Sequence, residues 1–185
     1  RQILWGLFKK IVIADNCAVI ANMIFDNSDG YGGSTLLLGA LFYTVQIYAD
    51  FSGYSDIAIG VSRLLGFNII RNFKNPYLSL NITDFWRRWH ISLSSWLRDY
   101  LFSPLSIKLR GWGMTGIIVS LFVTFLLCGM WHGANYTFIV WGALHGLALA
   151  WDVVSARTRK KIRKKATPTL YNFISWSITF IFIVF

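Results

Sequence analysis

Two histidines, each followed by glycine, lie in the most apolar half of this chain. They are His132 and His145, in the segment CGMWHGANYTFIVWGALHG that spans residues 128–146. Apolar surroundings favour a neutral imidazole, which can accept a proton as a general base near pH 7. Gly133 would let a substrate or a second backbone approach His132 closely. The alternative is a histidine that hydrogen-bonds across packed helices, and the residue types alone leave both interpretations open.

His145 and His90 are placed differently from His132. His145 lies about 20 Å from His132 along a straight helix, too far to share one small site. Gly142 and Gly146 form a GxxxG pair that favours close helix contact, so we expect His145 to pack and hydrogen-bond. His90 follows two arginines and a tryptophan, and is either a surface residue or part of the same cavity as His132. The three histidines match no metal-binding pattern, and we expect no metal site.

Two aspartates form a second candidate group. Asp50 and Asp56 lie in YADFSGYSD, inside a long apolar stretch. A charge within a membrane is costly, so each aspartate should be paired, and Arg63 or Arg71 is a candidate partner. The functional interpretation is a proton relay or a pair that orients substrate. The structural interpretation, which we favour, is a salt bridge where a helix breaks at Ser52-Gly53.

The composition indicates a membrane protein. Of the 185 residues, 55% are hydrophobic and 14% are charged, against about 25% charged in a typical soluble domain. The net charge is +10, but seven of the eighteen basic residues fall in one run, RTRKKIRKK, at residues 157–165. A basic loop flanked by apolar segments fits the cytoplasmic side of a membrane rather than a nucleic-acid site. We therefore expect a bilayer as partner, and no nucleic acid.

Apolar segments of about 20 residues are candidate membrane spans. They predict an all-α, multi-pass helix bundle, which we expect to be a single membrane-embedded unit over residues 1–185 and an internal fragment of a larger fold. A loop is expected at 26–34, a connector at 64–80 and a bend at 131–133. The candidate spans are residues 3–25, 35–61, 114–131, 134–154 and 169–185.

Residues 82–105 differ from the spans because they mix tryptophans with arginines and aspartates. Aromatic and basic side chains gather at membrane–water interfaces, so we expect one amphipathic helix lying along the interface. Asn81 or Thr83 would cap this helix, and Asp84 with Arg88 forms a favourable i,i+4 pair.

Three longer strings resemble the membrane-bound O-acyltransferases. They are QIYADFSGYSDIAIGVSRLLGF, NFKNPYLSLNITDFWRRWHISLSSWLRDYLF and MWHGANYTFIVWGALHG, and they are most similar to the branch that O-acetylates bacterial alginate, with teichoic acid D-alanyl transfer as a more distant branch. The resemblance implies a helix bundle around a tunnel and a catalytic histidine at His132. It implies a second functional histidine at His90. Channel or structural candidates are Trp131, Gly133, Asn135, Asp50, Asp56 and Arg88.

The resemblance implies an O-acetyltransferase of the bacterial inner membrane that acts on an exported polysaccharide such as alginate. The acyl donor would be acetyl-CoA or another acyl thioester, with no bound cofactor. A periplasmic or extracellular acetyl-transfer protein would be a partner. Two other classes stay open: a proton-coupled transporter that uses the aspartates and histidines, and a noncatalytic membrane subunit.

Overall fold

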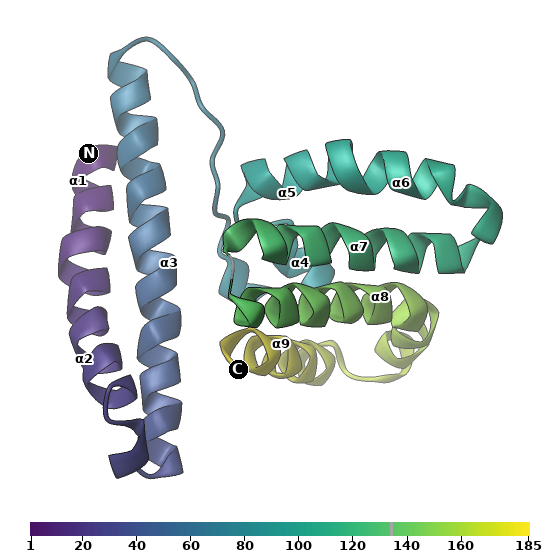
Figure 1. Ribbon diagram of the computed structural model, residues 1–185. Helices are drawn as coiled ribbons and strands as arrows, with labels where there is room; N and C mark the ends of the chain where they lie inside the picture. Colours follow the sequence, from purple (N-terminus) through teal and green to yellow (C-terminus); the bar gives the residue numbers. More distant parts are fainter. Residues whose placement is uncertain (134) are drawn as a thin grey trace. The chain divides into compact units, whose positions relative to one another are not determined.

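The computed structural model describes residues 1–133 and 135–185, and within them it is helical with no strand. The predicted all-α class is confirmed. The described chain divides into two compact units, Arg1–Lys74 with Ile181–Phe185, and Asn75–Phe180. Figure 1 shows the helices of each unit. The single membrane-embedded unit over 1–185 stays a prediction.

The first unit is a long helical hairpin. Residues 2–25 form a continuous helical stretch that lies antiparallel to α3, which covers residues 33–64 (Figure 1). The stretch contacts α3 along its length. Glycines make this contact close, because a Cβ on Gly6 would lie 2.6 Å from the Gly53 carbonyl oxygen, and one on Gly60 would lie 2.4 Å from Ile3 Cγ1. The elements are α1 (Gln2–Leu7), the π-helix η1 (Phe8–Ala14), α2 (Asp15–Phe25), the 3-10 turn η2 (Ser28–Gly30) and α3 (Gly33–Leu64).

The predicted connector at 64–80 follows α3. It is extended up to the 3-10 turn η3 (Pro76–Leu78). The ring of Phe73, which is buried, lies 5.7 Å from Tyr48 and 5.0 Å from Phe51 between centroids. The connector is therefore held against α3 by aromatic packing in the absence of regular secondary structure.

The second unit is built around the antiparallel pair α7 (Met114–His132) and α8 (Tyr136–Lys165). A Cβ on Gly129 would lie 3.0 Å from Gly142 Cα, and one on Gly142 would lie 2.4 Å from the Phe125 carbonyl oxygen. These contacts confirm the expected close approach at Gly142. The other helical elements are α4 (Ile82–Trp86), α5 (Ile91–Leu97), η4 (Arg98–Phe102), α6 (Ser103–Lys108), η5 (Arg110–Trp112) and α9 (Pro168–Val184).

The prediction of one helix over 82–105 is wrong. The helix stops after Trp86, and His90 takes a left-handed conformation with φ 44° before α5 begins. Tertiary contacts outweigh helix propensity here, because the break leaves the Trp86 indole pointing at α8, where it donates a hydrogen bond to His145. The predicted cap at Asn81 is confirmed, since its side-chain oxygen accepts from the Asp84 backbone N–H at 2.8 Å.

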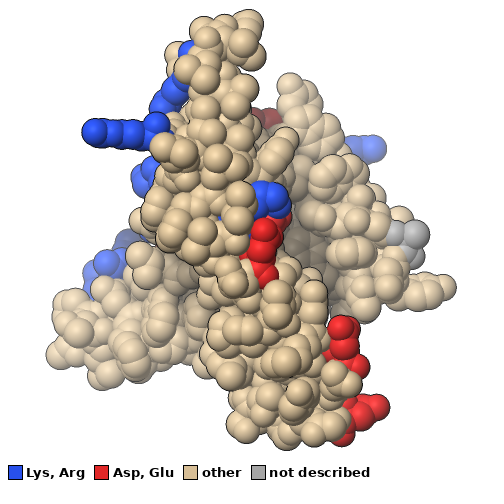
Figure 2. All heavy atoms as spheres, turned by 90° about the vertical axis from the view of Figure 1, so that its left-hand side faces the viewer, with Lys and Arg blue, Asp and Glu red and all other residues tan. Residues whose placement is uncertain are grey.

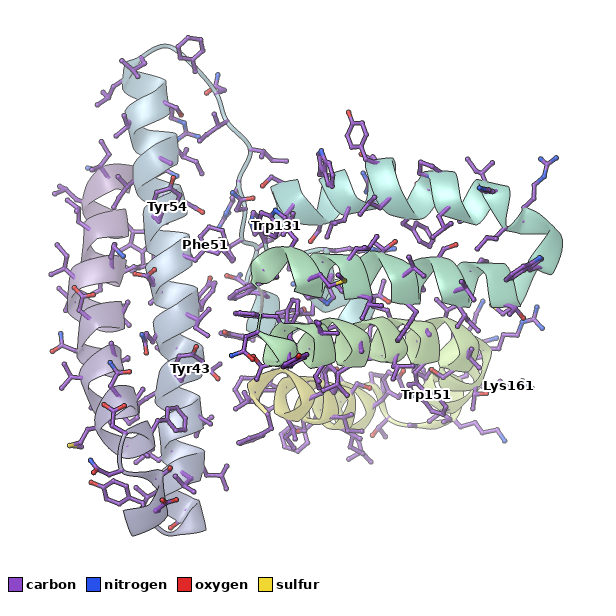
Figure 3. All side chains as sticks on the ribbon, in the orientation of Figure 1. Tyr43, Phe51, Tyr54, Trp131, Trp151 and Lys161 are labelled. Carbon is purple, nitrogen blue, oxygen red and sulfur yellow. The ribbon has the colours of Figure 1, made fainter. Side chains whose placement is uncertain are left out.

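The basic run at 157–165 is also not a loop, because α8 continues through Lys165. Lysine and arginine are good helix formers, and cations are favourable near a helix C-terminus. Asp152 also stabilises this part of α8, because its carboxylate accepts a hydrogen bond from the Arg159 guanidinium at 2.5 Å. Trp151 and Lys161 project from the surface of this long helix (Figure 3).

Among the described residues, α7 and α8 are long and apolar enough to cross a membrane, and α9 is a shorter apolar helix of 17 residues. The predicted span 114–131 coincides with α7. Ala134, the first residue of the predicted span 134–154, lies outside the described residues. The spans at 3–25, 35–61 and 169–185 are helical, and their passage through a bilayer stays a prediction. The face of the first unit in Figure 2 is mostly uncharged.

Candidate active site

His132 is the last residue of α7 and is surrounded by aromatic rings on part of its surface. Its ring centroid lies 5.1 Å from Trp131, 6.0 Å from Phe138 in a stacked arrangement and 5.2 Å from Trp141 at 82°. The side chain is exposed in the described chain, and a buried general base at His132 stays a prediction. The reason for the exposure is its position at a helix end, where rings cover some sides of the imidazole and leave another open. An accessible imidazole can meet a substrate.

The residues after His132 have structural roles. A Cβ on Gly133 would lie 2.8 Å from the Phe138 ring, so glycine here makes room for that ring. The close substrate approach expected at Gly133 stays a prediction. Asn135 caps α8, because its side-chain oxygen accepts from the Thr137 N–H at 3.1 Å. Both residues shape the tight connection that presents His132.

His90 lies within electrostatic reach of His132. The pKa of His90 is lowered first by partial burial and then by the charge of His132. Its Nδ1 lies 3.4 Å from the Ser92 hydroxyl, which restrains the ring at the start of α5. The two interpretations of His90, a surface residue or part of the same cavity as His132, stay predictions. A catalytic role for either histidine stays a prediction.

His145 is buried and hydrogen-bonded, as expected from its GxxxG setting. Its Nδ1 accepts from the Trp86 indole N–H at 3.3 Å. The centroid of Trp141 lies 4.7 Å from His145 and 5.2 Å from His132. One tryptophan therefore contacts both histidines, although they are 13 positions apart. We call Trp86, His132, Trp141 and His145 the ring cluster.

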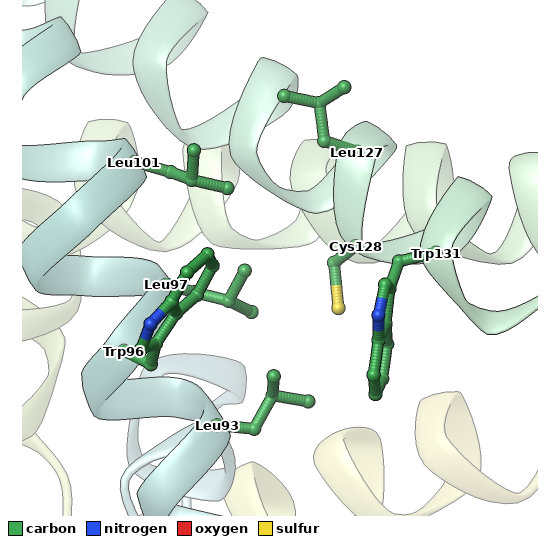
Figure 4. A pocket seen from close by; sticks show the side chains of 7 residues that line it. All are labelled: Leu93, Trp96, Leu97, Leu101, Leu127, Cys128 and Trp131. Atoms are coloured by element: carbon green, nitrogen blue, oxygen red, sulfur yellow. The ribbon is translucent and has the colours of Figure 1, made fainter.

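An apolar cavity of about 330 Å³ lies between α5, η4 and α7, and Trp131, the residue before His132, is part of its lining (Figure 4). Leucine and tryptophan side chains provide most of its wall, and the Cys128 thiol faces it. Its lining contains no charged residue. It is lined by Leu93, Trp96, Leu97, Leu101, Leu127, Cys128 and Trp131.

Arg88 pairs with Asp84 one turn earlier, with Nε 2.9 Å from the carboxylate. This is the i,i+4 pair expected from the sequence, and both side chains are partly exposed. An arginine paired within its own segment supports the structural interpretation over a channel role.

Asp50 and Asp56 pair with lysines instead of the predicted arginines. Asp56 accepts from Lys9 Nζ at 2.6 Å, and Asp50 pairs with Lys10. We call these four residues the lysine–aspartate clamp. The predicted break at Ser52-Gly53 is also wrong, because α3 is continuous there. Packing of η1 along α3 brings two adjacent lysines to the aspartates, a contact that needs the antiparallel fold.

The network around the clamp is extended by uncharged groups. Lys9 also donates to the Ser52 hydroxyl at 3.0 Å, and Gln2 donates to Asp56 at 3.1 Å. Arg63, a predicted aspartate partner, instead donates to the Gln2 side-chain oxygen at 2.6 Å. Each aspartate is thus matched by a cation and satisfied locally, which supports the structural interpretation of both residues.

Sequence reasoning missed Trp86, Trp141 and Asp152. The signal for Asp152 was a lone carboxylate in an apolar helix; it is buried and accepts from the Thr83 N–H at 2.8 Å, which ties α4 to α8. The signal for Trp141 was its spacing, one turn before His145. Among the described residues no three His, Cys, Asp or Glu side chains converge as metal ligands do.

Comparison with known proteins decides the family. Residues 2–185 match the model of the membrane-bound O-acyltransferase family. The chain belongs to this family. The probable alginate O-acetylase AlgI of Pseudomonas fluorescens is 49% identical over 179 residues, which is 97% of this chain and 34% of that protein.

Other members are also similar. The peptidoglycan O-acetyltransferase of Helicobacter pylori is 43% identical over 96% of this chain and 33% of its own length. The teichoic acid D-alanyltransferase of Bacillus subtilis is 34% identical over 100% of this chain and 48% of its own length. The chain spans about a third of the length of the O-acetylating relatives. The described chain is helical and belongs to a family of membrane proteins.

Proposed function

We propose that this chain carries the catalytic core of an O-acetyltransferase that acts on hydroxyl groups of an exported polysaccharide such as alginate. The observation that carries the proposal is His132, an accessible imidazole at a helix end, bordered by aromatic rings and within electrostatic reach of His90. The names of the alginate and peptidoglycan relatives support acetyl as the group and a cell-surface polymer as the acceptor.

A sugar hydroxyl is a poor nucleophile, so the reaction needs a base. In the proposed step the neutral His132 imidazole takes the hydroxyl proton while the oxygen attacks the thioester carbonyl carbon. The new ester C–O bond forms, the C–S bond breaks, and the thiolate leaving group receives the proton from His132. A hydrogen-bond donor must stabilise the developing oxyanion, and we assign His90 to orient the acceptor or the oxyanion.

The donor in this proposal is acetyl-CoA or another acyl thioester, and a periplasmic or extracellular acetyl-transfer protein is a partner in the modification of the polymer. We place the protein in the bacterial inner membrane with residues 157–165 on the cytoplasmic side, because lysine and arginine resist translocation. A cysteine replacing Thr158 should resist impermeant thiol reagents in intact cells. Labelling of that cysteine from outside would reverse the orientation.

The test is polysaccharide acetylation by the intact protein in its own membrane. Loss of a general base costs about 10²–10⁴-fold in rate, so we expect a loss of that size for both His132→Ala and His132→Gln. Asn27→Ala, in an exposed turn, is the control for amount and insertion. Normal acetylation by a His132→Ala protein present at the normal amount would refute the assignment of His132 as base.

The aspartates define the competing class. A proton-coupled transporter would need Asp50 or Asp56 to exchange protons, yet each is paired with a lysine. Family membership and these pairs favour the transferase over the transporter, and over a subunit that only positions a partner. Acetylation that survives Asp50→Asn would support this choice.

A further inference from the structure

Aromatic contacts connect His132 through Trp141 to two buried residues of the second unit, Trp86 and His145. Trp141 meets the His132 ring edge to face at 5.2 Å and 82°, and meets Trp86 in the same manner at 5.7 Å and 77°. His145 also contacts Trp141, with 4.7 Å between the ring centroids. Edge-to-face contacts have a preferred orientation, because the positive edge of one ring faces the negative face of the next.

Of these residues, Trp86 and His145 are held in place more firmly than His132. Trp86 and His145 are 6% and 7% exposed, while His132 is exposed. The Trp86 indole N–H donates to His145 Nδ1 at 3.3 Å, and the Trp86 ring also packs on Phe125 at 4.9 Å. This hydrogen bond joins α4 to α8, so it holds Trp141 between two restrained neighbours.

We propose that Trp141 is a positioning residue for His132, and that the Trp86–His145 hydrogen bond holds Trp141 in place. This rests on His132 being the proposed base. Phe138 stacks on the imidazole at 25° and Trp141 meets it at 82°, so the two rings restrict rotation of the side chain from two directions. A base must be held within a few tenths of an ångström of its productive position. Loss of Trp141 would leave the imidazole present and misoriented.

The test measures initial acetylation rates of the intact protein at varied donor and acceptor concentrations. Loss of one oriented aromatic contact should lower kcat about 3- to 10-fold, so this loss is expected for Trp141→Phe, with unchanged KM and unchanged amount in the membrane. Trp151→Phe is the matched control, because it makes the same exchange at a 69% exposed position on the same helix. Wild-type kcat for Trp141→Phe would overturn the proposal.

The hydrogen bond is tested by variants that keep or remove it. Trp86→Phe should lower kcat about 3-fold, and His145→Ala should lower it at least as much, because it also removes the ring contact with Trp141. The double variant should match His145→Ala, because the hydrogen bond is already lost there. His145→Gln should retain most of the rate, since its amide oxygen can accept from the indole. If the His145→Ala protein does not accumulate, the comparison of kcat between Trp86→Phe and His145→Gln tests the hydrogen bond. Equal kcat values for these two variants would overturn the role of the Trp86–His145 hydrogen bond.

The two proposals fail separately. Normal activity of a His132→Ala protein present at the normal amount would refute the assignment of His132 as base, and with it the positioning role of Trp141. A large loss in His132→Ala together with a wild-type kcat in Trp141→Phe keeps the base and refutes only the positioning role.

Discussion

The lysine–aspartate clamp of the first unit and the ring cluster of the second both place polar side chains in apolar helices, but they satisfy them differently. In the clamp, each carboxylate meets an ammonium group. In the ring cluster, His145 is hydrogen-bonded while His132 has aromatic neighbours and an accessible side. Polar side chains in apolar helices therefore occur in two settings here: the paired charges hold helices together, and the accessible imidazole at a helix end is the base that we propose.

The Lys9–Asp56 pair gives the largest expected effect on stability. The two side chains are 12% and 19% exposed, and removal of one partner of a buried pair costs about 3 kcal/mol. Lys9→Met should therefore lower the unfolding midpoint of the intact protein in detergent. Lys9→Met combined with Asp56→Leu should recover much of the loss, because no unpaired charge remains. Equal stability of the single and double variants would contradict the structural interpretation of the clamp.

The close contact between α7 and α8 in the second unit gives the next largest expected effect on stability. A Cβ at Gly142 would lie 2.4 Å from a backbone oxygen of α7, so Gly142→Ala must push the two helices apart. Overpacking of this kind costs about 1–3 kcal/mol. Gly111→Ala, where nothing lies within 4 Å of the added carbon, serves as control in the same thermal unfolding measurement. A stable Gly142→Ala protein would show that the hairpin tolerates separation.

Lys10–Asp50 should matter less than Lys9–Asp56. Its side chains are 44% and 47% exposed, and solvent-exposed ion pairs contribute less than about 1 kcal/mol. Lys10→Met should shift the unfolding midpoint less than Lys9→Met does. A larger shift of the unfolding midpoint for Lys10→Met than for Lys9→Met would contradict this. It would mean that the bilayer, and not the neighbouring side chains, determines the free-energy cost of these charges.

A pH dependence at His90 is the smallest expected effect. Burial and His132 lower the pKa of His90 in the fold, so the unfolded chain binds more protons just below the ordinary histidine pKa of about 6.5. Stability should then fall as pH drops from about 6.5 towards the folded pKa, and stay level above 6.5. His90→Asn keeps a residue that tolerates the left-handed backbone. An equally steep decline in that variant would assign the dependence to other groups.

The sequence predicted the features that depend on local chemistry. The α7–α8 hairpin follows from two apolar runs separated by a glycine, and the Asn81 cap follows from its side-chain oxygen. His145 was expected to pack because Gly142 and Gly146 bring helices together. These features are set by neighbours within a few turns, so residue types and spacing carry the information.

Features that depend on partners far apart in the chain were missed. Lys9 was not assigned to Asp56 because 47 positions separate them, and only antiparallel packing joins them. The break at His90 was missed because the mixture of aromatic and charged side chains was interpreted as one amphipathic helix, and the hydrogen bond between Trp86 and His145 appears only in the fold. Trp141 was overlooked because its place between two histidines is a property of the hairpin.

The most direct test compares the two regions in one assay: polysaccharide acetylation per molecule of membrane-inserted protein, for His132→Ala and Asp56→Asn. The account predicts a loss of about 10²–10⁴-fold for His132→Ala at the normal amount, as for loss of a general base. For Asp56→Asn it predicts a reduced amount of protein whose rate per molecule is close to wild type. A wild-type rate per molecule in His132→Ala, or an abolished rate at the normal amount in Asp56→Asn, would contradict it.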